Sequence, residues 1–297
     1  MQVVDYIVVG GGAAGIGALS ELRDAGETSV MLVEGRDTLG YTLSWMEEIP
    51  FGAVSGATYT GTQFREEYLQ PVTRDPAVRL GHRVFAVDLE QRVVHVTTPE
   101  QEHEKIGFSH LIVAVGAVQV LFGRHLLPGR RTNRMFTTYQ VGEMLAHYPF
   151  QPGHNVIFYG SSPYLTETVR AAQRAGIATT VVSPDEPAEA DYPHATLSAV
   201  RGEGTFSGVK IEQNGAHREL TGDALVVDGD FVLERQWREM LGVRWELEAA
   251  QTTIPADHPQ RDVFTLIGDA AQPDPDFVRQ YERARNVIRE VRPQVTA

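Results

Sequence analysis

The sequence of 297 residues contains no cysteine. This absence excludes disulfides, thiolate metal sites, cysteine-held iron–sulfur clusters and a thiol nucleophile within the chain. Basic residues are also few, since 26 Lys and Arg stand against 39 Asp and Glu, for a formal net charge of −13. A field of that sign repels phosphate backbones and anionic membranes, so we expect no nucleic-acid partner and no membrane partner.

Long apolar runs are missing as well. The longest extends from Leu111 to Phe122 with Gln119 inside it, and it falls short of the roughly 20 residues that cross a bilayer. The run Val3–Val9 comes without a basic segment and a cleavable apolar one before it, so we expect a cytoplasmic protein. The length and a hydrophobic share of 42% predict two globular domains.

Two βαβ patterns about 150 residues apart organise the chain. The first joins Val3–Val9 through a glycine turn to a helix that stops at Gly26 and to a second strand, Val30–Val33. The second repeats this order between the strands Val156–Tyr159 and Thr179–Val182. Continuous β-branched runs suit buried parallel strands. We therefore expect an α/β fold with two Rossmann-like dinucleotide-binding domains.

Four further elements are predicted between and after these patterns. They are a short helix around Thr62–Gln70, an antiparallel hairpin of Val84–Val87 with Val93–Val96, a buried strand Leu111–Gly116, and a helix from about Pro275 to Val291.

The first glycine turn has the spacing that binds a dinucleotide. Gly10 permits the tight turn, Gly12 lets backbone N–H groups approach a pyrophosphate, and Gly15 lets helix and strand pack closely. The helix N-terminus adds positive partial charge for the phosphates. Glu34 lies 19 residues after Gly15, at the end of the second strand, where a carboxylate can accept hydrogen bonds from a ribose diol.

The second turn departs from this pattern. It has Gly160, Ser162 and Leu165 at the three glycine positions, which compromises both the close approach and the close packing. The strand after it ends at Ser183–Asp185 without an arginine pair for a 2′-phosphate. A working nucleotide site and a reduced or lost one are equally open, and NADH is the better guess over NADPH if the site works.

The sequence indicates no metal site and names no catalytic residue. Ten histidines are scattered without a His-Glu-x-x-His spacing. The turn Gly160–Ser162 lacks the second glycine of a hydrolase nucleophile elbow, because that position is Tyr164, so hydrolysis is disfavoured.

Taken together, the motifs point to a family. The glycine motif with Glu34, the strand Leu111–Gly116, the second βαβ pattern, Ile267–Asp269 and the pair Arg279–Gln280 resemble the thioredoxin-reductase-like branch of the FAD-dependent pyridine nucleotide-disulfide oxidoreductases. The resemblance covers essentially the whole chain. It implies a homodimer with two Rossmann-like domains of the three-layer ββα type, the second inserted into the first. FAD would occupy residues 1–117 plus 251–297, and 118–250 would form an NAD(P)-type domain with a degenerate glycine motif.

The resemblance also assigns roles by position. Glu34 would take the adenosine ribose, and the backbone of Val84 the adenine. Asp269 would bind the ribityl and pyrophosphate region, while Arg279 and Gln280 would sit near the pyrimidine edge of the isoalloxazine. The residues that we expect at the cofactor are Gly10, Gly12, Ala13, Ala14, Gly15, Glu34, Gly35, Arg36, Gly40, Tyr41, Val84, Ala114, Gly116, Gly268, Asp269, Arg279 and Gln280.

Departures from the family are equally informative. The family's reductases keep a Cys-x-x-Cys pair just before the second glycine motif, where this chain has Phe136–Gln140, so a flavin-to-disulfide relay within the chain is chemically impossible. Tyr41 replaces the family's glutamine, which predicts a rebuilt substrate face. The aromatic residues of this region favour loop packing, although the family's flavin-facing wall comes from the same segment; they are Tyr41, Trp45, Phe51 and Tyr59.

A second resemblance concerns the middle of the chain. The stretches Arg124–Gly129, Phe150–Val156 and Gly160–Pro163 look more like the flavoprotein subunits of amino-acid and opine dehydrogenases and of hydrogen cyanide synthase. Those subunits usually carry a cysteine-rich iron–sulfur segment, which this chain lacks.

Two functions follow as hypotheses. The first is an FAD-dependent oxidoreductase that moves electrons between flavin and a small molecule or a protein partner without a disulfide, so that it is not a thioredoxin reductase. The second is a non-catalytic flavoprotein subunit or FAD-binding module that needs a partner chain.

Overall fold

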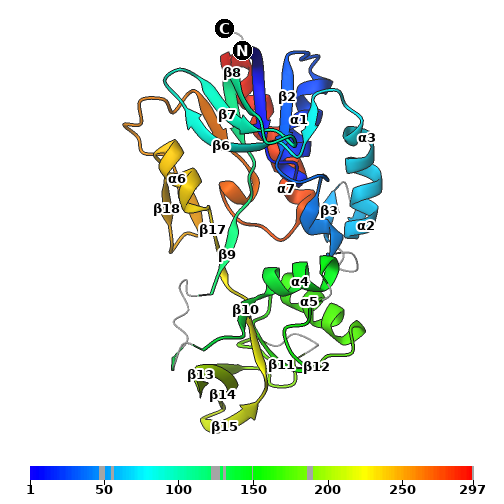
Figure 1. The fold of residues 1–297 in the computed structure, drawn as a ribbon, viewed down its shortest axis with the longest axis vertical. Helices are drawn as coiled ribbons and strands as arrows, with labels where there is room; N and C mark the ends of the chain where they lie inside the picture. Colours follow the sequence, from blue (N-terminus) through cyan, green and yellow to red (C-terminus); the bar gives the residue numbers. More distant parts are fainter. Residues whose placement is uncertain are drawn as a thin grey trace. The chain divides into compact units, whose positions relative to one another are not determined.

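The computed structural model describes residues 1–46, 51–54, 57–121, 128–129, 132–148, 150–185 and 190–295 (Figure 1). Contacts divide the chain into two compact units. Unit 1 comprises Met1–Leu43, Pro50–Val118 and Phe231–Ala297, and unit 2 comprises Ser44–Ile49 and Gln119–Asp230. Residues 124–127, which begin the second resemblance, lie outside the described residues, as do the side chains of Phe51 and Tyr59.

Unit 1 is built on a mostly parallel sheet. Its strands are β1 (Gln2–Val9), β2 (Val30–Glu34), β5 (Val78–Leu80), β6 (Arg83–Asp88), β7 (Val93–Thr97), β8 (His103–Val113) and β20 (Phe264–Leu266). They follow the order β5-β2-β1-β8-β7-β6, with β20 also paired to β8. The pairs made by β1, β2, β5, β8 and β20 with one another are parallel, whereas β6, β7 and β8 form the antiparallel part, which includes the predicted hairpin.

The register aligns the ends of the parallel strands. Val9, the last residue of β1, lies opposite Val33 of β2 and Val113 of β8. Leu266, the last residue of β20, is also opposite Val113. The residues that follow these four strands are therefore collected at one edge of the sheet, the edge outside which ligands bind in open α/β sheets.

Helical segments complete unit 1. They are α1 (Ala13–Asp24), the 3-10 turn η1 (Tyr41–Ser44), α2 (Gly61–Phe64), the π-helical η2 (Arg65–Leu69), α3 (Gln70–Thr73), α6 (Arg235–Leu241), the 3-10 turn η3 (Gly268–Ala270) and α7 (Phe277–Val295). The short helix predicted near 62–70 is thus a run of three segments. α1 and α7 pack so closely that a Cβ at Gly17 would lie 2.5 Å from the carbonyl oxygen of Tyr281.

Short strands form three two-stranded sheets. They are β3 (Phe51–Val54) with β4 (Ala57–Tyr59), β9 (Val118–Val120) with β17 (Asp230–Val232), and β18 (Arg244–Glu246) with β19 (Gln251–Thr253).

Unit 2 repeats the parallel arrangement and adds an antiparallel sheet. A parallel sheet has the order β10 (Met135–Thr137), β16 (Ala224–Val227), β11 (Asn155–Tyr159) and β12 (Ala178–Val182). The antiparallel sheet comprises β13 (Ala195–Glu203), β14 (Thr205–Gln213) and β15 (Ala216–Thr221). The helices are α4 (Thr138–His147) and α5 (Pro163–Arg174).

The two faces of the parallel sheet in unit 2 bury different neighbours. Val156 and Phe158 of β11 share a core cluster with Val169 of α5. Ile157, which points to the opposite face, shares a cluster with Leu197 of β13 and with other residues of the antiparallel sheet. This alternation is the period of two that a strand imposes, and it places helices on one face and strands on the other.

The prediction of an α/β fold with parallel sheets is confirmed. Within the described part of the chain, the structure has no helix of the length and apolarity needed to cross a membrane.

Candidate functional site

The glycine turn after β1 is shaped by steric crowding. Gly10 has φ +107° and donates its N–H to the carbonyl of Val33 at 2.9 Å. A Cβ at Gly10 would lie 2.3 Å from the carbonyl oxygen of Ala114, and a Cβ at Gly15 would lie 1.9 Å from that of Gly10. Both distances are far inside van der Waals contact, so the fold itself requires glycine at these two positions.

Gly12 is different, because the described protein gives no reason for a glycine there. Its φ is −79°, which any residue adopts. A Cβ on Gly12 would meet none of the described atoms within 4 Å. The space beside Gly12 is therefore open and leads directly to the start of α1.

The N-terminus of α1 is prepared for an anion. Gly12 is the N-cap, so no side chain of that residue can cap the helix, and the first turn has no acidic residue. Ala13 and Ala14 continue the turn and are buried. The first backbone N–H groups of a helix lack intrahelical partners and carry the positive end of the helix dipole. This combination binds phosphate.

Glu34 is anchored to the backbone on both sides of its carboxylate. Its Oε2 accepts a hydrogen bond from Gly11 N at 2.6 Å, and its Oε1 accepts one from Arg36 N at 2.7 Å. Each oxygen keeps a second lone pair. The backbone after β2 is held in turn by His82, whose N–H donates to the Glu34 carbonyl at 2.9 Å.

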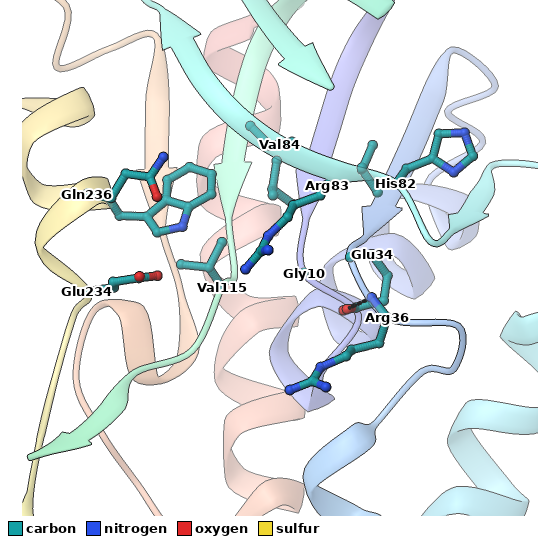
Figure 2. A pocket seen from close by; sticks show the side chains of 13 residues that line it. Gly10, Glu34, Arg36, His82, Arg83, Val84, Val115, Glu234 and Gln236 are labelled. Carbon is teal, nitrogen blue, oxygen red and sulfur yellow. Dashed lines mark hydrogen bonds between the residues drawn. The ribbon is translucent and has the colours of Figure 1, made fainter. Parts of the chain in front are cut away.

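A cavity of about 450 Å³ opens beside this carboxylate. Of the predicted cofactor residues, it is lined by Gly10, Glu34, Gly35, Arg36 and Val84. Figure 2 shows the Arg83 side chain extending into it, with Glu34 on one side and Val115 on the other.

Other residues that line this cavity were not predicted from the sequence. Arg83 and His82 directly precede Val84, so their place at the start of β6 was a usable signal. Glu234 and Trp237 come from α6 and the residue before it, more than 150 residues further along the chain, and no sequence pattern connects them to the cavity.

Asp269 and Gln280 meet at the end of β20. Gly268 has φ +61°, and a Cβ there would lie 2.6 Å from the Cβ of Ala14, so η3 lies against the start of α1. Asp269 Oδ1 accepts hydrogen bonds from the backbone N–H of Asp274 and from Nε2 of Gln280, both at 2.9 Å. Gln280 is buried and also donates to the carbonyl of Asp274.

The Asp269 carboxyl has a raised pKa. Burial raises the pKa of this carboxyl to about 7, against the opposing hydrogen bond from the Asp274 N–H, and the charge of Asp274 also raises it. The group can therefore both donate and accept a proton near pH 7. The Arg279 guanidinium forms ion pairs with Asp274 at 3.0 Å and with Asp276 at 3.3 Å.

Four further predicted residues are described by their contacts or backbone conformation. Ala114 follows β8 and donates its N–H to the Val9 carbonyl at 2.8 Å. Gly40 has φ +62° and donates to the Gly11 carbonyl at 2.8 Å. The Arg36 guanidinium lies 4.0 Å from the ring centre of Tyr41. Gly116 has φ +71°.

Trp45, by contrast, packs within unit 2. It is buried, and its ring lies edge-on to Tyr139 at 5.1 Å between centroids. It also approaches Tyr164 at 6.2 Å, and a Cβ at Gly142 would lie 2.6 Å from its ring. For Trp45, this is the packing role that the sequence favours.

The second glycine turn is occupied by side chains of the protein. The carboxylate of Asp228, after β16, accepts a hydrogen bond from Ser162 N at 2.8 Å and one from Gln119 Nε2 at 3.2 Å. Burial raises the pKa of Asp228, and the hydrogen bonds from this turn and from Gln119 oppose that rise. Ser161 Oγ donates to Asp185 at 2.5 Å. The sequence reasoning did not identify Asp228.

Known folds resemble that of the whole chain. The structure of L-proline dehydrogenase from P. horikoshii is similar, with a TM-score of 0.71 and 20% identity, over 98% of this chain and 55% of that one. This chain therefore spans about half the length of that protein. Bacillithiol disulfide reductase from Bacillus cereus is similar with a TM-score of 0.68 and 15% identity, over 99% of this chain and 100% of that one.

A third similar structure is thioredoxin reductase from Lactococcus lactis, with a TM-score of 0.67 and 14% identity over 99% of each chain. Identities this low show a shared fold alone. No curated protein matches the chain. A sequence family described as pyridine nucleotide-disulphide oxidoreductase matches residues 4–238, which is more than half of the chain. The chain therefore belongs to the pyridine nucleotide-disulphide oxidoreductase family, and it does so without a single cysteine.

Proposed function

We propose that the chain is an FAD-dependent oxidoreductase in which unit 1 holds FAD and unit 2 is an NAD(P)-type domain inserted into it. The observation that carries the proposal is Gly12. The fold explains Gly10 and Gly15 by crowding, but it leaves Gly12 with an ordinary φ and open space. A glycine that the protein does not need for itself is expected where a ligand must approach the backbone.

The neighbouring groups suit the rest of an FAD molecule. The start of α1 offers N–H groups and positive partial charge to a pyrophosphate. Glu34 offers carboxylate lone pairs to ribose hydroxyls at the mouth of the cavity beside Val84. Asp269, with its pKa near 7, offers both a donor and an acceptor to ribityl hydroxyls. These polar groups come from three strand ends that the register aligns.

When bound, FAD supplies the redox chemistry, and the protein binds and orients it. Asp269 can hold a proton beside the cofactor near neutral pH. Because the chain has no cysteine, no dithiol within it can exchange electrons with the flavin. The reaction partner is then a small molecule or a second protein, and the missing dithiol distinguishes this chain from a thioredoxin reductase.

Flavin binding tests the proposal directly. The purified chain, stripped of ligand and titrated with FAD, is expected to bind about one FAD and to show the flavin absorption bands. FMN and riboflavin lack the adenosine that Glu34 and the cavity would contact, so they are expected to bind at least about 100-fold more weakly, the loss of about two charge-assisted hydrogen bonds. A chain that takes up no FAD, or that prefers FMN, would contradict the proposal.

A second candidate is a flavoprotein module that requires a partner chain. It is favoured by the second turn, where Asp228 and Asp185 accept the hydrogen bonds of Ser162 and Ser161. Bound FAD without turnover of amines or amino acids, and turnover on adding the product of a neighbouring gene, would support this candidate. Robust turnover by the chain alone would reject it. The homodimer and the cytoplasmic address stay predictions, to be checked by light scattering and by cell fractionation.

A further inference from the structure

Asp228 in unit 2 occupies the position that Ala114 holds in unit 1. Each residue follows the strand that pairs in parallel with the strand leading into the glycine turn, β8 with β1 in unit 1 and β16 with β11 in unit 2. Ala114 donates its N–H to the Val9 carbonyl, and Asp228 donates its N–H to the Tyr159 carbonyl, at 2.8 Å in both cases. The two glycine turns are thus built alike, and unit 2 has a carboxylate where unit 1 has a methyl group.

The carboxylate of Asp228 reaches into the turn. A Cβ at Gly160 would lie 2.2 Å from the Cβ of Asp228, and Asp228 Oδ2 accepts the N–H of Ser162 at 2.8 Å. Gln119 holds the other oxygen at 3.2 Å. Gln119 is itself fixed, because its Oε1 accepts a hydrogen bond from Thr138 Oγ1 at 2.8 Å. The carboxylate is therefore held in place by two anchored donors.

Several other groups of this turn are already hydrogen-bonded or lack a donor. Ser162 is the N-cap of α5, and its Oγ accepts the N–H of Leu165 at 3.3 Å. Pro163 has no N–H to offer. The hydroxyl of Ser161 donates to Asp185, the acid after the second strand. At the start of α1, by contrast, no described side chain caps the helix.

We propose that Asp228 is a specificity-determining residue that closes the phosphate-binding turn of unit 2, so that unit 2 does not take the pyrophosphate of NADH or NADPH. The flavin then exchanges electrons with a reactant other than a pyridine nucleotide. This electron exchange depends on the FAD function proposed above, whereas the closure of the turn does not.

Charge repulsion sets the size of the effect. A phosphate that took the N–H of Ser162 would have to lie within about 4 Å of the carboxylate that now accepts it. Two like charges at that distance and an effective dielectric constant of about 20 lower affinity by about 1000-fold. Such a penalty moves a micromolar nucleotide site into the millimolar range.

The test uses the FAD-loaded full chain and three variants. Asp228→Ala removes the carboxylate, Asp228→Asn removes its charge but keeps an oxygen that can accept the Ser162 N–H, and Glu212→Ala removes one exposed charge from β14 of the same unit as a control. Binding of NADH, NADPH and inorganic pyrophosphate is measured by calorimetry, and anaerobic bleaching of the flavin by rapid mixing.

The wild-type chain and Glu212→Ala are expected to bind none of the three probes at sub-millimolar concentration and to show no bleaching. Asp228→Ala is expected to bind pyrophosphate and NADH at least about 10-fold more tightly than the control. If Asp228→Ala fails to fold, Asp228→Asn is expected to show the same gain. Nucleotide binding by the wild type, or a folded Asp228 variant without any gain, would overturn the inference. If the chain did not hold FAD, the proposed function would be contradicted instead, and pyrophosphate binding would still test whether Asp228 closes the turn.

Discussion

Substituting Gly12 by alanine separates the needs of the fold from the needs of the ligand. In the protein without ligand, a Cβ at Gly12 meets no described atom within 4 Å and φ is −79°. Alanine then stabilises the chain by about 0.4–1 kcal/mol through the unfolded state. Alanine is a poorer N-cap than glycine by a similar amount. We therefore expect the free energy of unfolding of the apoprotein to change by less than about 1 kcal/mol.

Cofactor binding by Gly12→Ala is expected to respond quite differently. A methyl group at Gly12 fills the space through which a phosphate oxygen reaches the first N–H groups of α1. Losing one or two charge-assisted hydrogen bonds costs about 2–4 kcal/mol, which is about 30-fold to 1000-fold in the dissociation constant of FAD. The free energy of unfolding is measured by urea denaturation of the apoprotein, and affinity by quenching of FAD fluorescence.

Gly17→Ala provides the matched control for this experiment. A Cβ at Gly17 would lie 2.5 Å from the carbonyl oxygen of Tyr281, on the face that packs against α7. This variant is expected to lose about 1–3 kcal/mol of stability by overpacking, while the groups at the glycine turn stay in place. Two results would refute a role in FAD binding for the open space beside Gly12: FAD binding by Gly12→Ala as tight as by the wild type, or destabilisation of the apoprotein as large as that caused by Gly17→Ala.

Three other substitutions probe single groups. Glu34→Gln puts an amide N–H₂ against one of the backbone N–H groups of Gly11 and Arg36, so FAD titration should show a loss of about 10-fold to 100-fold, with Glu212→Gln unchanged. Burial raises the pKa of Asp269 to about 7, so the folded chain holds this proton more tightly than the unfolded chain does. This group alone therefore makes the apoprotein less stable as pH rises from 4 to 7, by at most about 4 kcal/mol. Asp269→Asn should remove that slope in urea titrations across this range. Burial lowers the pKa of His110 to about 4, so the contribution of this residue to folding stability is full above pH 6.5 and is lost as pH falls toward 4, by at most about 3 kcal/mol. His110→Gln should therefore change the pH profile of stability in the opposite sense to Asp269→Asn. A shift in the same sense would contradict both assignments.

Local pattern was sufficient for the framework of the site. The run Val3–Val9, the glycines after it and Glu34 are close in sequence, and strand period, turn chemistry and helix start each constrain neighbours along the chain. The predicted hairpin, the α7 helix and the strand before Gly116 follow from the same local signals. The crowding at Gly10 and Gly15 gives a structural reason for two of the three glycines.

What could not be predicted depends on contacts between distant segments. Trp237 lines the cavity beside Glu34, although the sequence assigns it to the second domain. Trp45 is close in sequence to the first glycine turn but belongs to unit 2, where it packs on Tyr139. The π-helical turn Arg65–Leu69 interrupts a segment whose weak periodicity predicts only a short helix. Side-chain packing decides each of these, and a single sequence does not record which partners meet.

The position of Asp228 can be interpreted by comparing the two glycine turns. In sequence it is an acid after an apolar strand, which is an ordinary end for a strand and gives no warning. Its meaning depends on the register that sets it beside Gly160 and opposite the end of β11. The same register in unit 1 leaves Ala114 beside Gly10, and the space beside Gly12 open. One backbone plan therefore serves both turns. We infer that the side chain after β8 or β16 decides whether the neighbouring turn accepts a phosphate or is closed by the protein itself.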